Sequence, residues 1–422
     1  MERRRFLHGS AAAAGLLTIS GNPAFAAEPT VSLDDLPLPV RNLERREAPA
    51  PISEAERVER RDAAQRLMAE QRLAGLLIEP GPTLDYFAGV SWSRSERLFG
   101  LLLPQRGPGV VIAPAFEKGR AELEVKDRYE IRVWQEDESP YALILKSLAA
   151  AGTPRGRVAV DPSARVFVLT GLAGEAGAAF QVVTGAPIVE GTRGIKSAHE
   201  IDIMRFANEV TLQAYAAAFN SLKPGMTQME LGRIISAAMT QLGYSGGALV
   251  LFGESSAYPH GAPNPKPLAE GDIVLVDGGL SVHGYRSDIT RTIALGNAPA
   301  EAQRVFEVVR GAQQAALATA RPGIPAGAVD DAARAFVTKA GYGDGYALFT
   351  HRVGHGIGLE GHEWPYLVRG NTVELQAGMS FSDEPGIYQY GKYGVRTEDI
   401  MVINHAGAQL LTSPATGLRF DP

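Results

Sequence analysis

The segment DIVLVDGGLSVHGYRSDITRT, residues 272–292, predicts two short strands joined by a turn. Its apolar run ends at Asp277, and after a turn centred near Val282 and His283 the chain returns through Asp288. Because the two aspartates are equally far from that centre, a regular antiparallel hairpin would place them opposite each other, with Cβ atoms about 5 Å apart. Facing carboxylates repel unless a cation or a proton lies between them, so this pair predicts a metal site. The alternative is two acids on an exposed hairpin that bind nothing.

A second pair of carboxylates follows the same pattern. Glu384 and Glu398 are equally far from a turn centred on Gly391. Four carboxylates in one place could hold two divalent ions about 3.5 to 4 Å apart, provided that two of them bridge. His355, within GHGIG at 354–358, would add one nitrogen ligand, and we expect the glycines around it to let the backbone approach the metals closely.

Composition limits the classes of protein and of ligand. The chain has 422 residues, which favours two domains. A hydrophobic share of 45% and a charged share of 21% are typical of a globular protein without stable membrane insertion. The formal net charge of -6 argues against nucleic acid as a partner. Since there is no cysteine, any metal must be held by histidine and carboxylate, a set that suits manganese, cobalt, zinc or iron.

The C-terminal part, 195–422, contains an internal repeat. Ser197 and Glu200 form a capping box before an apolar helical pattern, and Thr227 and Glu230 form another. The segment 224–244, from a Pro-Gly pair through an amphipathic helix to Gly-Tyr, is echoed at 322–342. Each half then supplies a histidine and a hairpin with two carboxylates, which predicts two related α+β halves facing each other across one site.

Residues 53–190 alternate helical and strand-like patterns. A helix is predicted over 54–73, strands near 75–79, 99–103, 110–113, 131–134 and 158–161, and a further helix over 141–151. This indicates a smaller α/β domain, without a catalytic group of residues. The stretch 27–52 is rich in proline and charge and is predicted to be a linker.

The first 26 residues have the order of a secretion signal. Arg3, Arg4 and Arg5 precede a short apolar run of small residues, which ends at Ala24-Phe25-Ala26. This is typical of a twin-arginine leader, and we expect cleavage after Ala26 and a periplasmic or extracellular protein. The alternative is a basic first helix of the mature fold.

With these motifs in place, the sequence resembles peptidase family M24, the creatinase or "pita-bread" superfamily, over essentially all of 195–422. The ordered set that carries the resemblance is Asp277, Asp288, His355, Glu384 and Glu398. The motifs HGIGLEGHE at 355–363 and DEPGIY at 383–388 are close to those of its Xaa-Pro aminopeptidase and Xaa-Pro dipeptidase (prolidase) branch. The resemblance implies an α+β pita-bread domain with a pseudo-two-fold repeat, preceded by a creatinase-type N-terminal α/β domain.

The resemblance also implies a role for each residue. Asp277 would bind one metal and His355 and Glu384 the other, while Asp288 and Glu398 would bridge both. Glu384 would also shuttle a proton, His260 would assist proton delivery to the leaving nitrogen, and His362 would hydrogen-bond the carbonyl oxygen. His351, Tyr388 and Arg396 would lie around the substrate or behind the ligands.

The implied function is hydrolysis of the amide bond between an N-terminal residue and proline in short peptides, by a hydroxide that bridges two divalent metals, with manganese favoured. A homodimer is expected. Two alternatives stay open. The chain could act on a small molecule, as the superfamily's amidinohydrolases and metal-dependent dimethylsulfoniopropionate lyases do, or it could be a non-enzymatic binding module, although such relatives have degraded metal sites.

Overall fold

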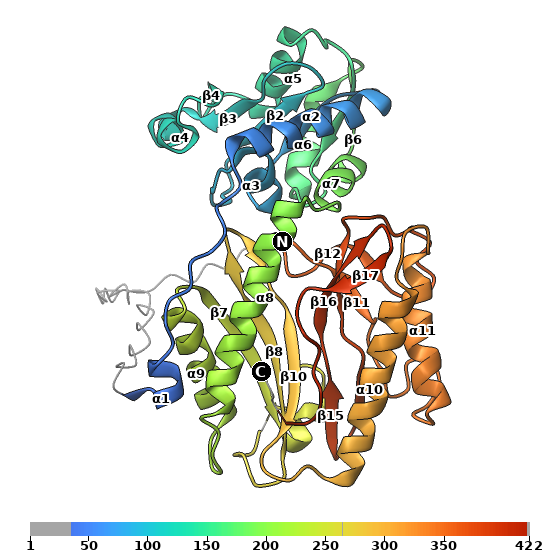
Figure 1. Ribbon diagram of the computed structural model, residues 1–422. Helices are drawn as coiled ribbons and strands as arrows, with labels where there is room; N and C mark the ends of the chain where they lie inside the picture. Colours follow the sequence, from blue (N-terminus) through green and yellow to red (C-terminus); the bar gives the residue numbers. More distant parts are fainter. Residues whose placement is uncertain (1–34, 264, 420–422) are drawn as a thin grey trace, which may run out of the picture. The chain divides into compact units, whose positions relative to one another are not determined.

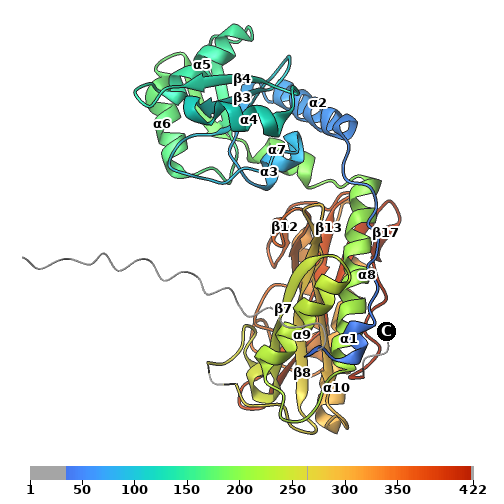
Figure 2. The same ribbon diagram turned by 90° about the vertical axis from the view of Figure 1, so that its left-hand side faces the viewer.

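The computed structural model describes residues 35–263 and 265–419 (Figures 1 and 2). The predicted leader, residues 1–26, lies outside the described residues, so its assignment stays a prediction. Within the described part of the chain, no helix is both long and apolar enough to cross a membrane.

The N-terminal domain has the predicted α/β class and is built on a six-stranded mixed sheet with helices. Its strands are β1 (Leu73–Ile78), β2 (Gly100–Pro104), β3 (Val110–Pro114), β4 (Glu130–Trp134), β5 (Gly156–Val160) and β6 (Phe180–Thr184), in the order β4-β3-β2-β1-β5-β6. Its helices are α2 (Glu54–Glu70), α3 (Pro82–Ala88), α4 (Lys118–Val125), α5 (Pro140–Ala150), α6 (Val166–Ala176) and α7 (Ala186–Arg193). The first five strands and helices α2 and α5 match the sequence patterns, whereas β6, α3, α4, α6 and α7 were not predicted.

The segment 37–52, inside the predicted linker, has one helical turn, α1 (Leu38–Arg41), and is otherwise irregular. It is nevertheless hydrogen-bonded to the C-terminal domain. The Arg46 carbonyl oxygen accepts a hydrogen bond from the Tyr244 hydroxyl at 2.7 Å. The carbonyl oxygens of Pro49 and Ala50 lie 3.0 and 2.9 Å from ring nitrogens of His283 and His199.

The first half of the C-terminal domain packs two helices on a sheet. Helices α8 (Ala198–Phe219) and α9 (Gln228–Gln241) begin with the predicted capping boxes. The strands are β7 (Ser245–Phe252), β8 (Ile273–Val282), β9 (Tyr285–Arg286) and β10 (Ile289–Ala294), in the order β10-β8-β7 with β9 paired to β8. Helix α9 packs against β7 and α8 against β8 (Figure 1).

The second half repeats this plan. Helices α10 (Ala300–Thr319) and α11 (Ala326–Lys339) accompany β11 (Gly354–Gly356), β12 (Glu363–Leu367), β13 (Ser380–Asp383), β16 (Asp399–Asn404) and β17 (Gly407–Leu410), in the order β12-β11-β13-β16-β17. The strands β14 (Gly386–Gln389) and β15 (Tyr393–Arg396) form a separate hairpin. Helices α9 and α11 both have 14 residues, and both of their ends differ by 98 residues in number, so the predicted repeat is confirmed.

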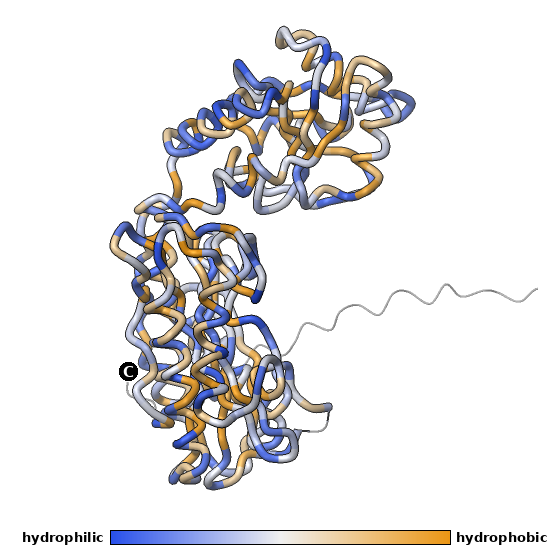
Figure 3. The backbone as a smooth tube through the Cα atoms, turned by 90° about the vertical axis from the view of Figure 1, so that its right-hand side faces the viewer, coloured by the Kyte–Doolittle hydropathy of each residue, from blue (hydrophilic) through white to orange (hydrophobic). Residues whose placement is uncertain are grey.

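The two halves meet through their inner strands. Thr290 of β10 forms an isolated antiparallel bridge with Glu398, just before β16, and the Glu398 amide donates to the Thr290 carbonyl oxygen at 3.1 Å. Hydrophobic and hydrophilic segments alternate along the chain (Figure 3), and the buried side chains of α10, α11, β13 and β16 form one continuous core. The helices therefore lie outside and the strands inside, which is the predicted α+β arrangement.

Candidate metal centre

A cavity of about 360 Å³ lies between the two halves of the C-terminal domain. It is lined by all five predicted metal ligands and by four of the other predicted site residues, namely Asp277, Asp288, His355, Glu384, Glu398, His260, His351, His362 and Arg396. Pro259, Gly278 and Arg352 complete the lining. The structure thus brings together residues that are up to 138 positions apart in the sequence.

The first hairpin carries two of the carboxylates, but its register differs from the prediction. Asp277 of β8 lies opposite Thr290 and not opposite Asp288, so the expected facing pair is wrong. The turn residues are His283 and Gly284, with φ of 49° and 88°, and the turn is centred one residue later than expected. A tight turn with two left-handed residues matches the twist of the flanking strands. Asp288 therefore lies diagonally across the hairpin from Asp277.

The second hairpin has the predicted register. Asp383 of β13 pairs with Asp399 of β16, and Gly386 of β14 pairs with Arg396 of β15, so both ladders are centred on Gly391. Glu384 and Glu398 lie in the interval between these two ladders. Both line the cavity, and the buried Glu398 reaches it from directly beside the first hairpin.

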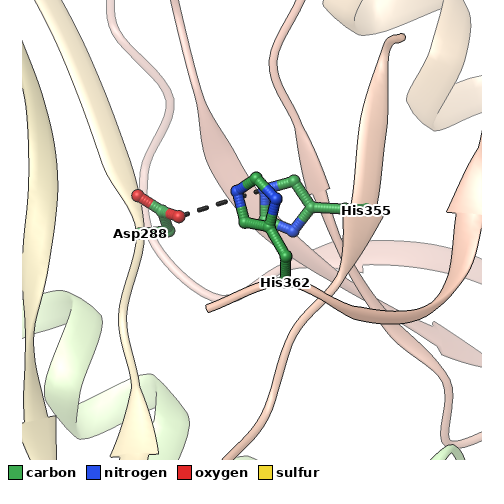
Figure 4. Close-up of side chains that lie close together, drawn as sticks. All are labelled: Asp288, His355 and His362. Atoms are coloured by element: carbon green, nitrogen blue, oxygen red, sulfur yellow. Dashed lines mark ion pairs between the residues drawn. The ribbon is translucent and has the colours of Figure 1, made fainter. Parts of the chain in front are cut away.

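The imidazole of His355 on β11 points at the carboxylates. Its Nε2 is 3.2 Å from Glu384 Oε1. The same nitrogen is 4.0 Å from Asp288 Oδ2, a pair that Figure 4 draws. Its Nδ1 is 3.0 Å from the Gly356 carbonyl oxygen. Because a carbonyl oxygen can only accept, Nδ1 carries a proton. Nε2 donates to Glu384, and on loss of that proton it would offer its lone pair to a metal in the cavity.

The glycines beside His355 allow close packing of its strand. A Cβ at Gly354 would collide with the Ser382 carbonyl oxygen on β13, and a Cβ at Gly356 would collide with backbone oxygens of Glu363 and Trp364. The glycines therefore let β11 pack tightly between its neighbouring strands, which fixes the position of His355. The expected approach of the backbone to the metals stays a prediction.

Burial makes the four carboxylates electrostatically unequal. Burial and the charge of Asp277 raise the pKa of Asp288 to about 7. Burial, with the charges of Asp288 and Glu384, raises the pKa of Glu398 well above its usual range. Burial acts in the same direction on Glu384, but the hydrogen bond with His355 and the charge of His351 lower its pKa to about 2. Asp288 and Glu398 thus lack the positive charge that a bound cation would supply.

The donor atoms form overlapping groups in which all atoms lie within 4.8 Å of one another. One group comprises Asp277, Asp288 and Glu398, and a second comprises His355, Glu384 and Glu398. Glu398 belongs to both. Carboxylate oxygens and an imidazole nitrogen suit divalent ions of manganese, cobalt, iron or zinc, so the residues present fit the expected metals. The third group contains Asp288, His355 and His362, which makes His362 a possible further donor.

A hydrogen-bonded chain lies behind these ligands. Arg396 donates to Asp277 Oδ2 at 2.6 Å and to the Tyr388 hydroxyl at 2.7 Å. The Tyr388 hydroxyl is also 2.7 Å from His351 Nε2, while His351 Nδ1 faces the Arg352 carbonyl oxygen at 2.8 Å. Since that carbonyl can only accept, His351 Nε2 is the acceptor and Tyr388 donates to it. These three predicted residues therefore hold Asp277 and one another in place.

His260 and His362, the two histidines predicted to contact the substrate, are exposed residues that line the cavity. The His362 ring stacks on His355, with centroids 3.7 Å apart and an interplanar angle of 23°. His260 follows the short helix η3 (Gly253–Ala257) and lines the cavity with an exposed side chain. Neither forms a hydrogen bond within the described chain, so both rings have donors and acceptors available to a substrate.

Sequence reasoning missed four supporting contacts. The Thr290 hydroxyl donates to Glu398 Oε2 at 2.7 Å, and the Ser382 hydroxyl donates to Glu384 Oε1 at 3.1 Å. Buried Glu363, next to His362, accepts from Lys196 and Arg193 at 2.6 Å each. Strand alternation could have found Thr290, because it is two residues from Asp288. The Glu363 contacts depend on chain segments that no local pattern connects.

Two family descriptions match this chain. The "Creatinase/Prolidase N-terminal domain" matches residues 60–195, and "Metallopeptidase family M24" matches residues 202–405. The protein named "Probable dipeptidase PepE" of Mycobacterium tuberculosis is 36% identical over 345 residues, which is 81% of this chain and 90% of the relative. The chain belongs to metallopeptidase family M24.

Further relatives agree with this membership. The Xaa-Pro dipeptidase of Lactobacillus helveticus is 33% identical over 345 residues, covering 81% of this chain and 93% of the relative. The crystal structure of dipeptidase PepE from Mycobacterium ulcerans has a TM-score of 0.79 and 34% identity, covering 86% of this chain and 97% of that one. Prolidase from Thermococcus sibiricus has a TM-score of 0.74 and 30% identity, covering 84% and 96%. The M24 chain described here is thus an enzyme of a metal-dependent peptidase family.

Proposed function

We propose that this M24 enzyme is a dinuclear exopeptidase that hydrolyses the amide bond between an N-terminal residue and proline in short peptides. The observation that carries the proposal is the shared position of Glu398 in two groups of donor atoms. One carboxylate common to two groups is what a pair of ions about 3.5 to 4 Å apart needs.

The ligands divide between two ions. Asp277 would hold one ion, and His355 with Glu384 would hold the other. Asp288 and Glu398 would contact both, in keeping with their lack of another full positive partner. Two divalent ions, manganese by preference, would supply a lowered pKa for a water molecule and stabilisation of negative charge on the substrate's carbonyl oxygen.

The side chains around the cavity perform the remaining steps. Glu384 accepts a proton from the attacking water, within reach of His355 at 3.2 Å. His362 donates a hydrogen bond to the carbonyl oxygen as negative charge develops there. His260, which also lines the cavity, assists delivery of a proton to the leaving nitrogen. The chain of His351, Tyr388 and Arg396 keeps Asp277 oriented during these steps.

The proline preference is drawn from the relatives that are named Xaa-Pro dipeptidase and prolidase. An amide to proline has no N–H and places a ring next to the scissile nitrogen. A site for such a bond must recognise shape and charge and cannot depend on a backbone hydrogen bond from that nitrogen.

The direct test is a substrate panel with purified protein and added manganese, cobalt or zinc. We expect hydrolysis of Ala-Pro and Gly-Pro, slow or no hydrolysis of Met-Ala-Ala, and complete loss of activity with a chelator. No hydrolysis of any Xaa-Pro peptide with any of the metals would contradict the proposal and favour a small-molecule substrate.

Export and assembly are separate proposals. We propose that residues 1–26 direct the folded enzyme through the twin-arginine route and that the enzyme forms a homodimer. Replacing Arg3, Arg4 and Arg5 with Lys should leave the enzyme in the cytoplasm. Unchanged secretion would argue against this route, and light scattering measures the oligomeric state.

A further inference from the structure

Two arginines line the cavity, and their surroundings differ. The guanidinium of Arg396 is buried, with donors directed to Asp277, Tyr388 and Thr290 at 2.6, 2.7 and 3.2 Å. It is therefore part of the frame that holds the ligands.

Arg352 has no such partner. Among the residues that the structure describes, its side chain forms no hydrogen bond and no ion pair with a carboxylate. Its side chain is exposed and lines the same cavity as the metal ligands. Arg352 thus brings an unneutralised positive charge to the cavity that the proposed metal ligands line.

An aromatic ring holds the Arg352 guanidinium in place. The Arg352 Cζ lies 4.4 Å from the ring centroid of Tyr366, and Tyr366 is paired with His355 across β11 and β12. Contact with a ring occupies the flat face of a guanidinium and leaves its in-plane N–H donors available. A guanidinium presented in this way fits the two oxygens of a carboxylate.

The substrate's own chemistry identifies that carboxylate. In a dipeptide that ends in proline, the free carboxylate is attached to the Cα next to the scissile nitrogen. In a longer peptide, an uncharged amide takes this place. Arg352 and His355 are three positions apart, a span of at most about 10 Å of extended chain, which is comparable to the length of a dipeptide.

We propose that Arg352, held by Tyr366, binds the C-terminal carboxylate of the substrate and makes the enzyme a dipeptidase. This inference rests on the proposed Xaa-Pro hydrolysis and specifies its substrate class. The four carboxylates and two ions of the proposed site would neutralise each other in charge. The positive charge of Arg352 then favours a substrate with a carboxylate at this end.

The test compares Ala-Pro with Ala-Pro-amide, which differ only in that carboxylate. With the metal-loaded enzyme, we expect kcat/KM to favour Ala-Pro, and Arg352→Gln to lower kcat/KM for Ala-Pro by roughly 10- to 100-fold, mainly through KM. Hydrolysis of the amide should change less than about threefold, and Arg352→Lys should restore part of the loss. The matched control is Arg369→Gln, since Arg369 is half exposed and pairs with Asp331 outside the cavity.

The outcomes separate this inference from the proposed function. Equal hydrolysis of Ala-Pro and its amide by the wild type, or an equal loss on both substrates in Arg352→Gln, would overturn the role of Arg352 while leaving Xaa-Pro hydrolysis intact. Failure of the wild type on both substrates with every metal would overturn the proposed function itself.

Discussion

The two hairpins that build the metal centre have the same number of carboxylates but different surroundings. Asp277 and Glu384 each have a cationic or hydrogen-bonding partner of their own, Arg396 at 2.6 Å and His355 at 3.2 Å. Asp288 and Glu398 have raised pKa values. Each hairpin thus contributes one carboxylate with a close partner and one whose pKa is raised by burial and by neighbouring carboxylates. The two with raised pKa values are those expected to contact both ions.

This difference predicts the largest effect for Asp288 and Glu398, the two carboxylates with raised pKa values. Asp288→Ala and Glu398→Ala should each lose both ions, and activity with them, because the remaining carboxylates lose their shared ligand. Asp277→Ala should lose about one of two ions. Elemental analysis of the purified variants measures this. Equal metal content in Asp277→Ala and Asp288→Ala would remove the distinction between the two classes of carboxylate.

The next effect separates metal binding from proton chemistry. His362→Ala should retain both ions while kcat falls by roughly 10² to 10³, the usual cost of one oxyanion donor. His260→Ala should retain metal and lose about 10² to 10⁴ if it assists proton transfer. The control is His405→Ala, an exposed residue outside the cavity. Metal loss in His362→Ala as complete as in Asp288→Ala would make His362 a ligand, as its group with Asp288 and His355 permits.

A smaller effect is expected where the two hairpins join. Thr290→Val removes the hydroxyl that donates to Glu398 at 2.7 Å and accepts from Arg396 at 3.2 Å. Loss of such a supporting contact should weaken metal affinity by roughly 10- to 100-fold, measured by competition with a chelator. Thr319→Val, on α10 and bonded only to the Ala315 carbonyl oxygen, is the matched control. Unchanged affinity in Thr290→Val would mean that Glu398 needs no orienting partner.

The smallest effect is expected for Glu56, a carboxylate that is paired with His199 and does not line the cavity. Glu56 lies 2.7 Å from His199 Nδ1. Burial acts to raise the pKa of Glu56, but hydrogen bonds with Ser53 and His199 lower it to about 2, while Glu56 raises the pKa of His199. The contribution of His199 to the free energy of unfolding is therefore complete below the pKa that His199 has in the unfolded chain. It is lost as pH rises through the raised pKa of the folded chain. The contribution of Glu56 to the free energy of unfolding is complete above the pKa that Glu56 has in the unfolded chain, and it is lost as pH falls toward 2.

His199→Gln should accordingly lower the free energy of unfolding by about 0.5 to 1 kcal/mol near pH 5.5 and by less near pH 9. Urea unfolding of the metal-saturated enzyme at the two pH values measures the difference. A larger loss at pH 9 than at pH 5.5 would contradict the assigned sign.

Much of the fold was predictable because local signals agree with it. The capping boxes at Ser197 and Thr227 mark two helix starts, and the echo of 224–244 at 322–342 gives the repeat. Helices α6 and α7 and strand β6 were missed. Helix α6 begins without a side-chain cap, and α7 begins after a glycine that likewise provides none.

The candidate site was predictable in its membership but not in its register. Spacing about Gly391 placed Glu384 and Glu398 correctly, since that hairpin is symmetric. The same reasoning failed for Asp277 and Asp288, because the turn is formed by His283 and Gly284 and is centred one residue later than equal spacing of the two aspartates implies. Arg352 was overlooked because its importance depends on what it does not contact, which only the surroundings of its side chain reveal.

The central claim is that two divalent ions are shared through Glu398, and elemental analysis combined with an activity titration tests it most directly. Purified enzyme should contain two divalent ions per chain, a chelator should abolish Ala-Pro hydrolysis, and activity should return as the second equivalent of metal is added. Full activity in a preparation that contains no transition metal would contradict the claim.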